Sequence, residues 1–260
     1  MSRGLESVDR FLRREDSFLA QAVQRISPEK GGEYRDPLVK RAAEVVIAAP
    51  MAVAGVPIVS ALATLIELDG GSPFYLDTRI DQEGKPFSII KLRSMRVGSE
   101  PDETTSLLAA QYDPEQDPRN TKLGKILREY DIDELPQIFQ VLSGKLALVG
   151  IRAVAPYAKG FMQDGLPADQ FAQWEEAYEE GKPGLINLNA VISHNRKDDI
   201  ARLRADLFYA EHKSLGFDLY IIFRLGSRIF SKFKEKLSKS SHTFYSYRQA
   251  GNVTKTSSGG

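Results

Sequence analysis

The pattern of polar and apolar positions contains one long apolar segment, which runs from Val45 to Ile66 without a charged side chain. As a single helix, these 22 residues would extend about 33 Å, enough to cross a hydrocarbon core roughly 30 Å thick. Pro50 and Pro57 interrupt the segment, and because they are seven residues apart, their kinks fall on nearly the same helical face. The pattern predicts a bent helix that enters a membrane and returns, with Pro57 as the break.

Charges at the two ends of this segment predict where the rest of the chain lies. Lys40 and Arg41 precede it, which the positive-inside tendency places at the cytoplasmic face, and Glu67 and Asp69 follow it. If the helix re-enters, everything after residue 68 is cytoplasmic too. The alternative is a buried helix of a soluble protein, which the many alanines of the segment leave open.

Alternating apolar and polar residues predict a β-hairpin after the apolar segment. The first strand is expected over 74–76 and 79–80, the turn over 82–85 and the second strand over 87–95. On the second strand, period two places Lys91 and Arg93 on the same side. Two neighbouring cations suit a diphosphate, because Arg offers a planar fork and Lys a compact charge, whereas a solvated strand end explains the pattern taken alone.

Basic residues recur every three positions further along, at Arg119, Lys122, Lys125 and Arg128. This spacing predicts a helix with one basic face and with Leu123, Ile126 and Leu127 turned towards the core. Beside a membrane segment, such a face would attract anionic headgroups or a phosphate carried by a lipid. An ordinary solvated face is equally compatible with the spacing.

The acidic heptapeptide Asp131–Gln137 precedes apolar residues at helical spacing up to residue 142. Asp131 and Glu134 have the separation of a capping box, which predicts a helix start. Carboxylates near a helix N-terminus are stabilised as anions, which makes them poor general acids but suitable nucleophiles or Mg²⁺ ligands. Asp133 and Glu134 are about 100° apart around the axis, so they cannot form the facing acid pair of a glycosidase.

Composition narrows the chemistry further. The chain has 260 residues with 35 basic and 35 acidic side chains, so it lacks the basic excess typical of general nucleic-acid binders. It has no cysteine, which excludes disulfides, thiolate catalysis and Cys-ligated metals, and its three histidines lack zinc-site spacing. Catalysis must then rest on carboxylates, Lys and Arg, with room for a hard oxygen-bound cation.

Both ends of the chain are polar around apolar residues at helical spacing. Residues 5–26 are expected to form an amphipathic helix packed on the main domain. Near the other end, Ile229, Phe230 and Phe233 lie among basic residues, which predicts a basic amphipathic helix on an anionic membrane surface, with core packing as the alternative. Residues 254–260 have the composition of a linker.

A series of short motifs occurs in order between residues 40 and 222. Among them are Lys40-Arg41, Pro57, Gly84-Lys-Pro-Phe87, Lys91-Leu-Arg-Ser-Met95, Asp117-Pro-Arg119, Asp133-Glu-Leu-Pro-Gln137, Leu148-Val-Gly150, Arg152 and Lys182-Pro-Gly184. Together they resemble the bacterial sugar transferase family, the monotopic phosphoglycosyl transferases that start glycan assembly on polyprenyl phosphate. The resemblance covers about 180 of the 260 residues and looks like that of a short-form enzyme.

The resemblance implies a two-step exchange at Asp133. This aspartate would attack the β-phosphate of a nucleotide diphosphate sugar, expected to be a UDP-sugar, and polyprenyl phosphate would then take the phosphosugar from the enzyme. Glu134 matches the second carboxylate of the family's pair, and Mg²⁺, with Asp133 as a ligand, would neutralise the diphosphate. The candidates for phosphate and substrate contacts are Lys91, Arg93, Arg119, Arg128, Gln137 and Arg152.

The expected fold is α+β and mainly helical, with a re-entrant membrane helix hairpin and a cytoplasmic catalytic domain that contains the small β-hairpin. Its parts are an N-terminal extension (1–39), the re-entrant helix (40–68), the catalytic domain (69–225) and a basic helix with a tail (226–260). The enzyme would be monotopic, at the cytoplasmic face of the bacterial inner membrane. Its partners would be a nucleotide sugar, polyprenyl phosphate and membrane lipids, with no nucleic acid, and homo-oligomers or glycan-assembly partners are left open.

Two departures from the family pattern bear on function. Gly150-Ile-Arg-Ala153 lacks the prolines that usually flank the arginine, and residues 185–190 differ from the usual sequence after Lys182-Pro-Gly184. They leave the Asp133 chemistry untouched but keep open a divergent acceptor, or an inactive member that serves as a membrane scaffold of a glycan-assembly complex. A soluble Mg²⁺-dependent nucleotide pyrophosphohydrolase is a third alternative, against which the apolar segment counts.

Overall fold

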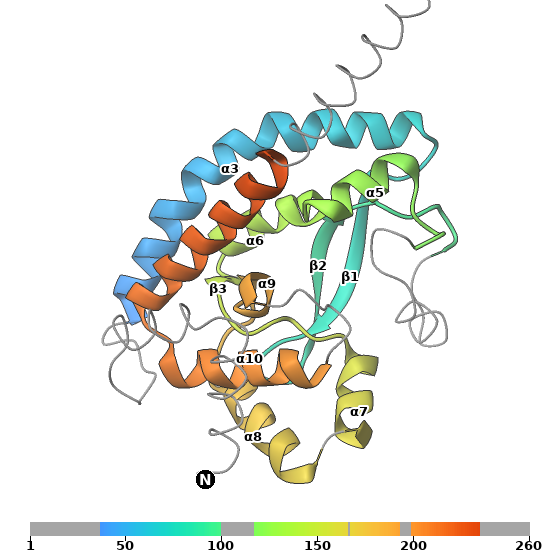
Figure 1. Cartoon of the computed structure of the whole chain (residues 1–260). Coiled ribbons are helices and arrows are strands. Elements are labelled where there is room, and N and C mark those ends of the chain that lie inside the picture. Colours follow the sequence, from blue (N-terminus) through green and yellow to red (C-terminus); the bar gives the residue numbers. More distant parts are fainter. Residues whose placement is uncertain (1–36, 100–116, 166, 193–198, 235–260) are drawn as a thin grey trace, which may run out of the picture. The chain divides into compact units, whose positions relative to one another are not determined.

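A computed structural model describes residues 37–99, 117–165, 167–192 and 199–234 of the chain. The chain divides into two compact units, Met1–Ile221 and Ile222–Gly260. The described part of the first unit is mostly helical, with two small two-stranded sheets, which confirms a mainly helical α+β fold (Figure 1). The helix predicted over 5–26 and the linker predicted over 254–260 lie outside the described residues.

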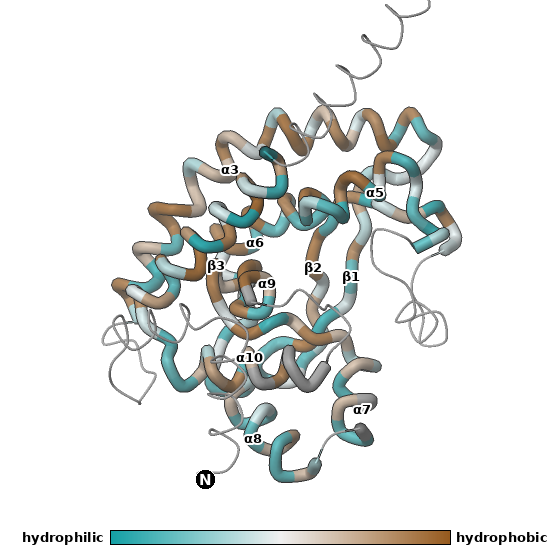
Figure 2. Tube along the Cα trace, viewed as in Figure 1, coloured by the Kyte–Doolittle hydropathy of each residue, from teal (hydrophilic) through white to brown (hydrophobic). Residues whose placement is uncertain are grey.

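The long apolar segment forms one continuous helix, α3 (Pro37–Leu68), which bends along its length in Figure 1 and is largely apolar in Figure 2. Pro50 and Pro57 lie inside it, and both are exposed. The buried residues of α3 form one stripe with several small side chains, consisting of Glu44, Ala48, Ala52, Gly55, Val59 and Ile66. The predicted apolar helix is confirmed, and its remaining surface presents exposed apolar side chains such as Val53.

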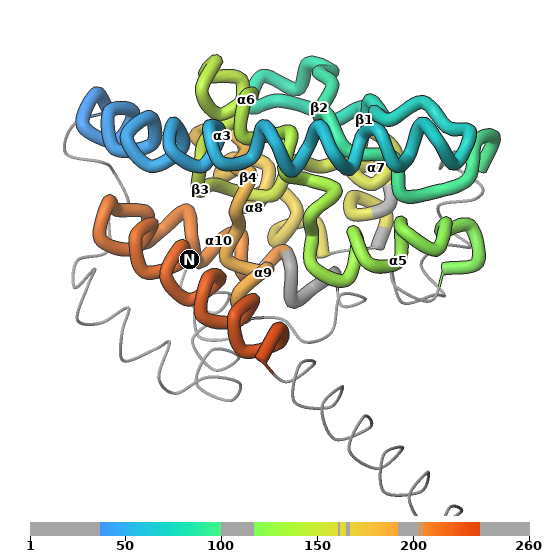
Figure 3. The backbone as a smooth tube through the Cα atoms, turned by 90° about the horizontal axis from the view of Figure 1, so that it is seen from above, coloured from blue at the N-terminus to red at the C-terminus, as the bar shows by residue number. Residues whose placement is uncertain are grey.

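In Figure 1 the other elements of the first unit lie below and to the right of α3, and the view from above in Figure 3 shows α3 running across them. In chain order, they are β1 (Phe74–Ile80), β2 (Pro86–Leu92), α5 (Lys122–Glu129), the 3₁₀ helix η1 (Ile132–Gln137), α6 (Ile138–Leu142), β3 (Ala147–Val149), α7 (Pro156–Gly165), α8 (Ala168–Glu179), β4 (Gly184–Ile186), α9 (Asn189–Ile192) and α10 (Asp199–His212). β1 and β2 pair antiparallel, and β3 and β4 pair parallel. The hairpin packs on η1, while α3 contacts β2, η1, α6 and β3.

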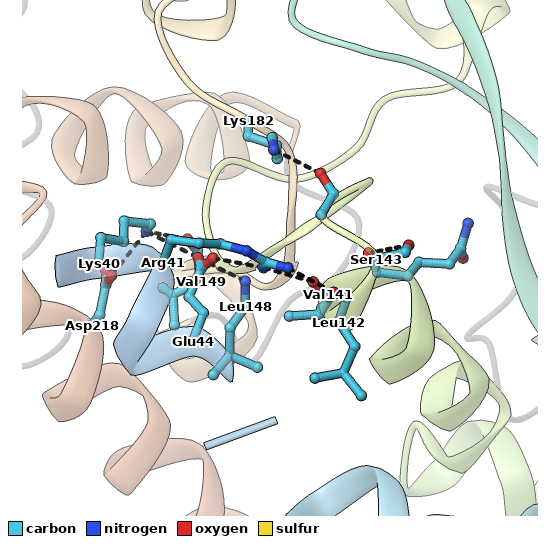
Figure 4. A network of polar contacts seen from close by, with 12 residues as sticks. Lys40, Arg41, Glu44, Val141, Leu142, Ser143, Leu148, Val149, Lys182 and Asp218 are labelled. Carbon is cyan, nitrogen blue, oxygen red and sulfur yellow. Dashed lines mark hydrogen bonds and ion pairs between the residues drawn. The ribbon is translucent and has the colours of Figure 1, made fainter. Parts of the chain in front are cut away.

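A polar network fixes the first turns of α3 to the rest of the unit (Figure 4). Arg41 donates to the carbonyl oxygens of Val141 and Leu142, each at 2.7 Å, and thereby satisfies two of the carbonyls at the end of α6. The ammonium of Lys40 pairs with Asp218 at 2.9 Å. The start of α3 is therefore held by the short helix that directly follows the acidic heptapeptide.

The hairpin forms as predicted, with a first strand that runs without a break from residue 74 to residue 80. In its turn, Gly84 has a φ of 75°, a left-handed conformation that glycine adopts without strain. The buried side chain of Gln140 completes the outer edge of β2, because it accepts the N–H of Ile90 at 2.8 Å and donates to the carbonyl of Ser88 at 2.7 Å. This amide docks α6, and with it η1, on β2.

The backbone of helix α5 packs directly against the backbone of the segment that follows β2. A Cβ atom added to Gly124 would lie 1.8 Å from the carbonyl oxygen of Ser94. Leu127 is buried, and Leu123 packs against the same apolar cluster. The prediction that Ile126 also faces the core is wrong, because it is 50% exposed. In so short a helix, only the i, i+4 pair reaches the cluster, and Ile126 points about 100° away from Leu127.

In the second unit, the described residues 222–234 belong to a helix that begins at residue 215. Phe223, Ile229, Phe230 and Phe233 are exposed on it. The predicted C-terminal helix is therefore confirmed up to residue 234. Its contact with a membrane surface stays a prediction.

Candidate active site

The hairpin register brings an acidic and two basic side chains together. Asp77 and Arg79 share a face of β1, since side chains alternate along a strand. The register pairs Tyr75 with Lys91, which puts Lys91 on that face as well. There the hairpin meets η1, and the ammonium of Lys91 lies 2.9 Å from Oε1 of Glu134.

Local geometry at the start of η1 turns the heptapeptide more tightly than predicted. Asp131 adopts a left-handed conformation with a φ of 55°, and its carbonyl accepts the N–H of Glu134 at 3.3 Å. The predicted capping box is wrong, since the Asp131 side chain makes no capping hydrogen bond. The α-helix begins at Ile138, because Pro136 has no N–H to donate to an α-helical partner and the preceding residues form a 3₁₀ helix.

Asp133 is held in a water-poor environment on η1. Its exposed fraction is 8%. Burial raises the pKa of Asp133 from 3.8 to about 6, and the positive charge of Lys91 opposes this rise only in part. The negative charge of Glu134 adds to the rise, and the positive charge of Arg128 opposes it. The expectation that this carboxylate is stabilised as an anion by a helix N-terminus is therefore wrong for Asp133.

Glu134 behaves in the opposite way. Burial opposes its ionisation, but the surrounding cations together outweigh burial and lower the pKa of Glu134 to about 2, and the largest contribution among them comes from the ammonium of Lys91 at hydrogen-bond distance. The charges of Arg152 and Arg79 act in the same direction. Two adjacent carboxylates thus differ in character, because the pKa of the buried Asp133 is raised while the pKa of Glu134 is lowered.

Three of the predicted phosphate contacts converge on this pair of carboxylates. Lys91 contacts Glu134 directly. Arg128 comes from α5, donates to the side chain of Asn120 at 3.1 Å, and affects the pKa of Asp133. Arg152 follows β3, where its segment bridges to Gly184, and its charge affects the pKa of Glu134. The site therefore combines cations from three separate segments around two carboxylates.

The other predicted contacts have different surroundings. Arg119 forms a two-point ion pair with Asp117, with nitrogen to oxygen distances of 2.8 and 3.0 Å. Arg93 donates to the carbonyl of Ser72 and lines a cavity of about 510 Å³ between the end of α3 and the start of α5, whose lining does not include the carboxylate pair. Gln137 is 3% exposed, and its buried Nε2 donates to no described group, so it retains a hydrogen bond for an oxygen acceptor.

Two charged residues at the site were absent from the sequence-based candidates. Asp77 lies 3.4 Å from Lys91 and also pairs with Arg79. Arg79 donates to the carbonyl of Ala153 at 3.1 Å, next to Arg152 in the chain. The signal that could have found them is period two on β1, which places both on the face of Lys91.

The donor set fits Mg²⁺ only in combination with a substrate. Among the described residues, there is no group of three or more His, Cys, Asp or Glu side chains that could hold a metal ion. Mg²⁺ is commonly bound by one or two carboxylates together with phosphate oxygens and water. Asp133 provides one such carboxylate, so the residues present fit a magnesium ion shared with a bound diphosphate.

Comparison with known proteins identifies relatives that share most of this chain. The UDP-glucose:undecaprenyl-phosphate glucose-1-phosphate transferase of Escherichia coli is 31% identical over 195 residues, which cover 72% of this chain and 39% of that protein. A UDP-N-acetylgalactosamine-undecaprenyl-phosphate N-acetylgalactosaminephosphotransferase of Aeromonas hydrophila is 30% identical and covers 65% of this chain and 38% of its own length. The exopolysaccharide production protein ExoY of Sinorhizobium fredii is 30% identical over 80% of this chain and 89% of its own length.

The chain spans less than half of the length of the first two of these relatives and nearly all of the third. The sequence profile of the bacterial sugar transferases matches residues 35–232, which contain α3, the hairpin and the carboxylate pair. This match covers most of the chain and includes each part of the site described above. The chain therefore belongs to the bacterial sugar transferase family.

Proposed function

We propose that this protein transfers a phosphosugar from a UDP-sugar to undecaprenyl phosphate and so initiates the assembly of a membrane-linked polysaccharide. The observation that carries the proposal is the buried Asp133 beside an ionised Glu134, with Lys91, Arg128 and Arg152 around them. Relatives named as undecaprenyl-phosphate sugar phosphotransferases support the same chemistry. They do not favour a non-catalytic scaffold.

In the first step, a carboxylate oxygen of Asp133 attacks the β-phosphorus of the UDP-sugar. The bond from that phosphorus to the bridging oxygen breaks, and UMP leaves with the electron pair. Lys91 and Arg152 bind the diphosphate oxygens, on which negative charge accumulates. A bound Mg²⁺ would add charge neutralisation at the diphosphate.

In the second step, a phosphate oxygen of undecaprenyl phosphate attacks the phosphosugar held on Asp133. The phosphorus to carboxylate bond breaks, which regenerates the ionised Asp133 and gives undecaprenyl diphosphosugar. The low exposure of Asp133 favours transfer to the lipid phosphate over hydrolysis, because it limits access of water to the covalent phosphosugar. Glu134 keeps Lys91 beside the reacting carboxylate through their ion pair.

The rate of UMP release is expected to rise with pH on the acid side of neutrality, with a midpoint near 6 that shifts lower when Mg²⁺ binds the same carboxylate. Asp133 must be ionised to attack, and its pKa is raised to about 6, so it is mostly protonated below that pH and ionised above it. Because Lys91 lowers this pKa, Lys91→Met should move the acid limb to higher pH as well as reducing the rate. Initial rates between pH 5 and 8 measure the effect, and a flat profile in both proteins would contradict it.

We also propose that α3 is embedded in the cytoplasmic leaflet of the bacterial inner membrane without crossing it. Its most apolar 18-residue window has a mean hydropathy of 2.2 and is only 17% buried, unlike the core helix of a soluble protein. Its start contacts α6 through Arg41, and Ile66 near its end packs with Leu92 and Leu127. Because both ends contact the same folded unit, a simple crossing would require that unit on both sides of the bilayer.

A donor panel tests the proposed function. The purified protein in detergent is incubated with Mg²⁺, undecaprenyl phosphate and each of several UDP-sugars, and UMP and lipid-linked product are quantified. We expect stoichiometric UMP and undecaprenyl diphosphosugar from at least one donor. Sugar-independent hydrolysis without lipid product would instead identify a pyrophosphohydrolase, and no turnover of any donor would count against a UDP-sugar transferase.

A further inference from the structure

A chain of alternating charges connects the hairpin to both sides of the candidate site. Oδ2 of Asp77 contacts a terminal nitrogen of Arg79 and lies 3.4 Å from the ammonium of Lys91. The same ammonium lies 2.9 Å from Glu134. At the other end of this series of charges, Arg79 donates to the carbonyl of Ala153 at 3.1 Å. One carboxylate oxygen therefore sits between two cations that reach different segments.

The position of Asp77 between these cations follows from strand geometry. Asp77 and Arg79 are two residues apart on β1, and Lys91 is the diagonal cross-strand neighbour of Asp77 on the same face. The side chains of all three are 14–18% exposed, so solvent screens their interactions only weakly. Lys91 and Arg79 repel each other, and an anion between them offsets that repulsion.

We propose that Asp77 is a positioning residue that orients two of the phosphate-binding segments at once. It holds Lys91 beside Glu134, and it holds Arg79 on the carbonyl of Ala153, which fixes the loop that carries Arg152. This role rests on the proposed function, because it assigns Asp77 to the binding of the sugar nucleotide diphosphate. Asp77 itself does not touch the substrate.

Replacement Asp77→Asn keeps the shape of the side chain and removes its charge. We expect kcat/KM for the UDP-sugar to fall 10- to 100-fold, as small misplacements of positioning groups do. Asp77→Glu should recover at least part of this loss, since it retains the charge. Glu83→Gln is the matched control, because it removes a carboxylate from the exposed hairpin turn, where Glu83 pairs only with Lys85 among the described residues, and should leave kcat/KM unchanged.

A double-mutant cycle separates positioning through Lys91 from a general structural role. If Asp77 acts through Lys91, the factor lost on Asp77→Asn shrinks at least several-fold when Lys91 is already methionine. An equal loss in both backgrounds would overturn the proposal, as would an Asp77→Asn protein with wild-type kcat/KM. Unfolding temperatures of all variants show whether each one is folded.

Chemical labelling gives a readout that does not depend on turnover. Trace acetylation followed by peptide mass spectrometry reports the reactivity of Lys91 relative to the exposed Lys125 in the same molecule. Release of Lys91 from Asp77 should raise this ratio several-fold in Asp77→Asn and leave it unchanged in Glu83→Gln. If the wild-type protein turned over no donor, the proposed function would fail, but this ratio would still show whether Asp77 positions Lys91. An unchanged ratio in Asp77→Asn would overturn the proposed role of Asp77.

Discussion

Asp133→Asn is expected to reduce lipid-dependent UMP release by at least about 10⁴-fold. Loss of a covalent nucleophile removes the attacking group itself, and residual rates then come only from binding and electrostatics. The substitution conserves the size of the side chain. Protein level, membrane association and the binding of the UDP-sugar should therefore change little. Initial rates with the preferred donor, at saturating undecaprenyl phosphate, measure the effect.

The same variant should be at least as stable as the wild type at pH 7. The pKa of Asp133 is raised from 3.8 to about 6 by burial, so keeping it ionised at neutral pH costs folding about 3 kcal/mol. A neutral amide removes that cost. Asp131→Asn is the matched control, because Asp131 is exposed and asparagine tolerates its left-handed backbone. Comparable inactivation of both variants, or an active Asp133→Asn protein, would contradict the assignment.

Single cysteines placed at both ends of α3 are expected to react only from the cytoplasmic side of the membrane. The natural chain has no cysteine, so each introduced thiol is labelled without background. Leu38 and Leu68 are 78% and 79% exposed at the two ends of the helix. With a membrane-impermeant maleimide, both Leu38→Cys and Leu68→Cys should be modified in inverted membrane vesicles and protected in intact spheroplasts.

Val53→Cys provides the comparison within the same helix. Val53 is 74% exposed in the middle of α3, on the surface that we place in lipid. Its thiol should remain unlabelled from either side until detergent is added. Labelling of one helix end from outside the cell would show that α3 crosses the membrane. Free labelling of Val53→Cys in inverted vesicles would show that the helix lies in water.

The local pattern of apolar and polar residues is sufficient to predict the helices and strands whose buried faces are specified by residues close in sequence. The apolar run becomes α3, and the hairpin forms with Gly84 in its turn, because a charge-free run and a two-residue alternation each specify one kind of surface. The prediction of β1 in two pieces, 74–76 and 79–80, omits Asp77, and it therefore could not indicate the ion pairs that Asp77 forms.

The chemistry of the carboxylate pair depends on contacts that no local period encodes. Lys91 and Glu134 are 43 positions apart and meet because Gln140 docks the helical segment on the edge of β2. Asp133 is buried by that docking, which reverses the pKa direction expected from a helix N-terminus. The left-handed conformation of Asp131 likewise replaces a capping box that residue types alone would indicate.

Trapping the covalent intermediate is the most direct test of the central claim. Wild-type protein is mixed with its UDP-sugar and Mg²⁺ without undecaprenyl phosphate, quenched, and examined by intact-protein and peptide mass spectrometry. We expect an added mass of one phosphosugar on the peptide that contains Asp133, which disappears when undecaprenyl phosphate is added and is absent from Asp133→Asn. An adduct at another residue, or lipid-linked product formed by an active enzyme without any adduct, would contradict it.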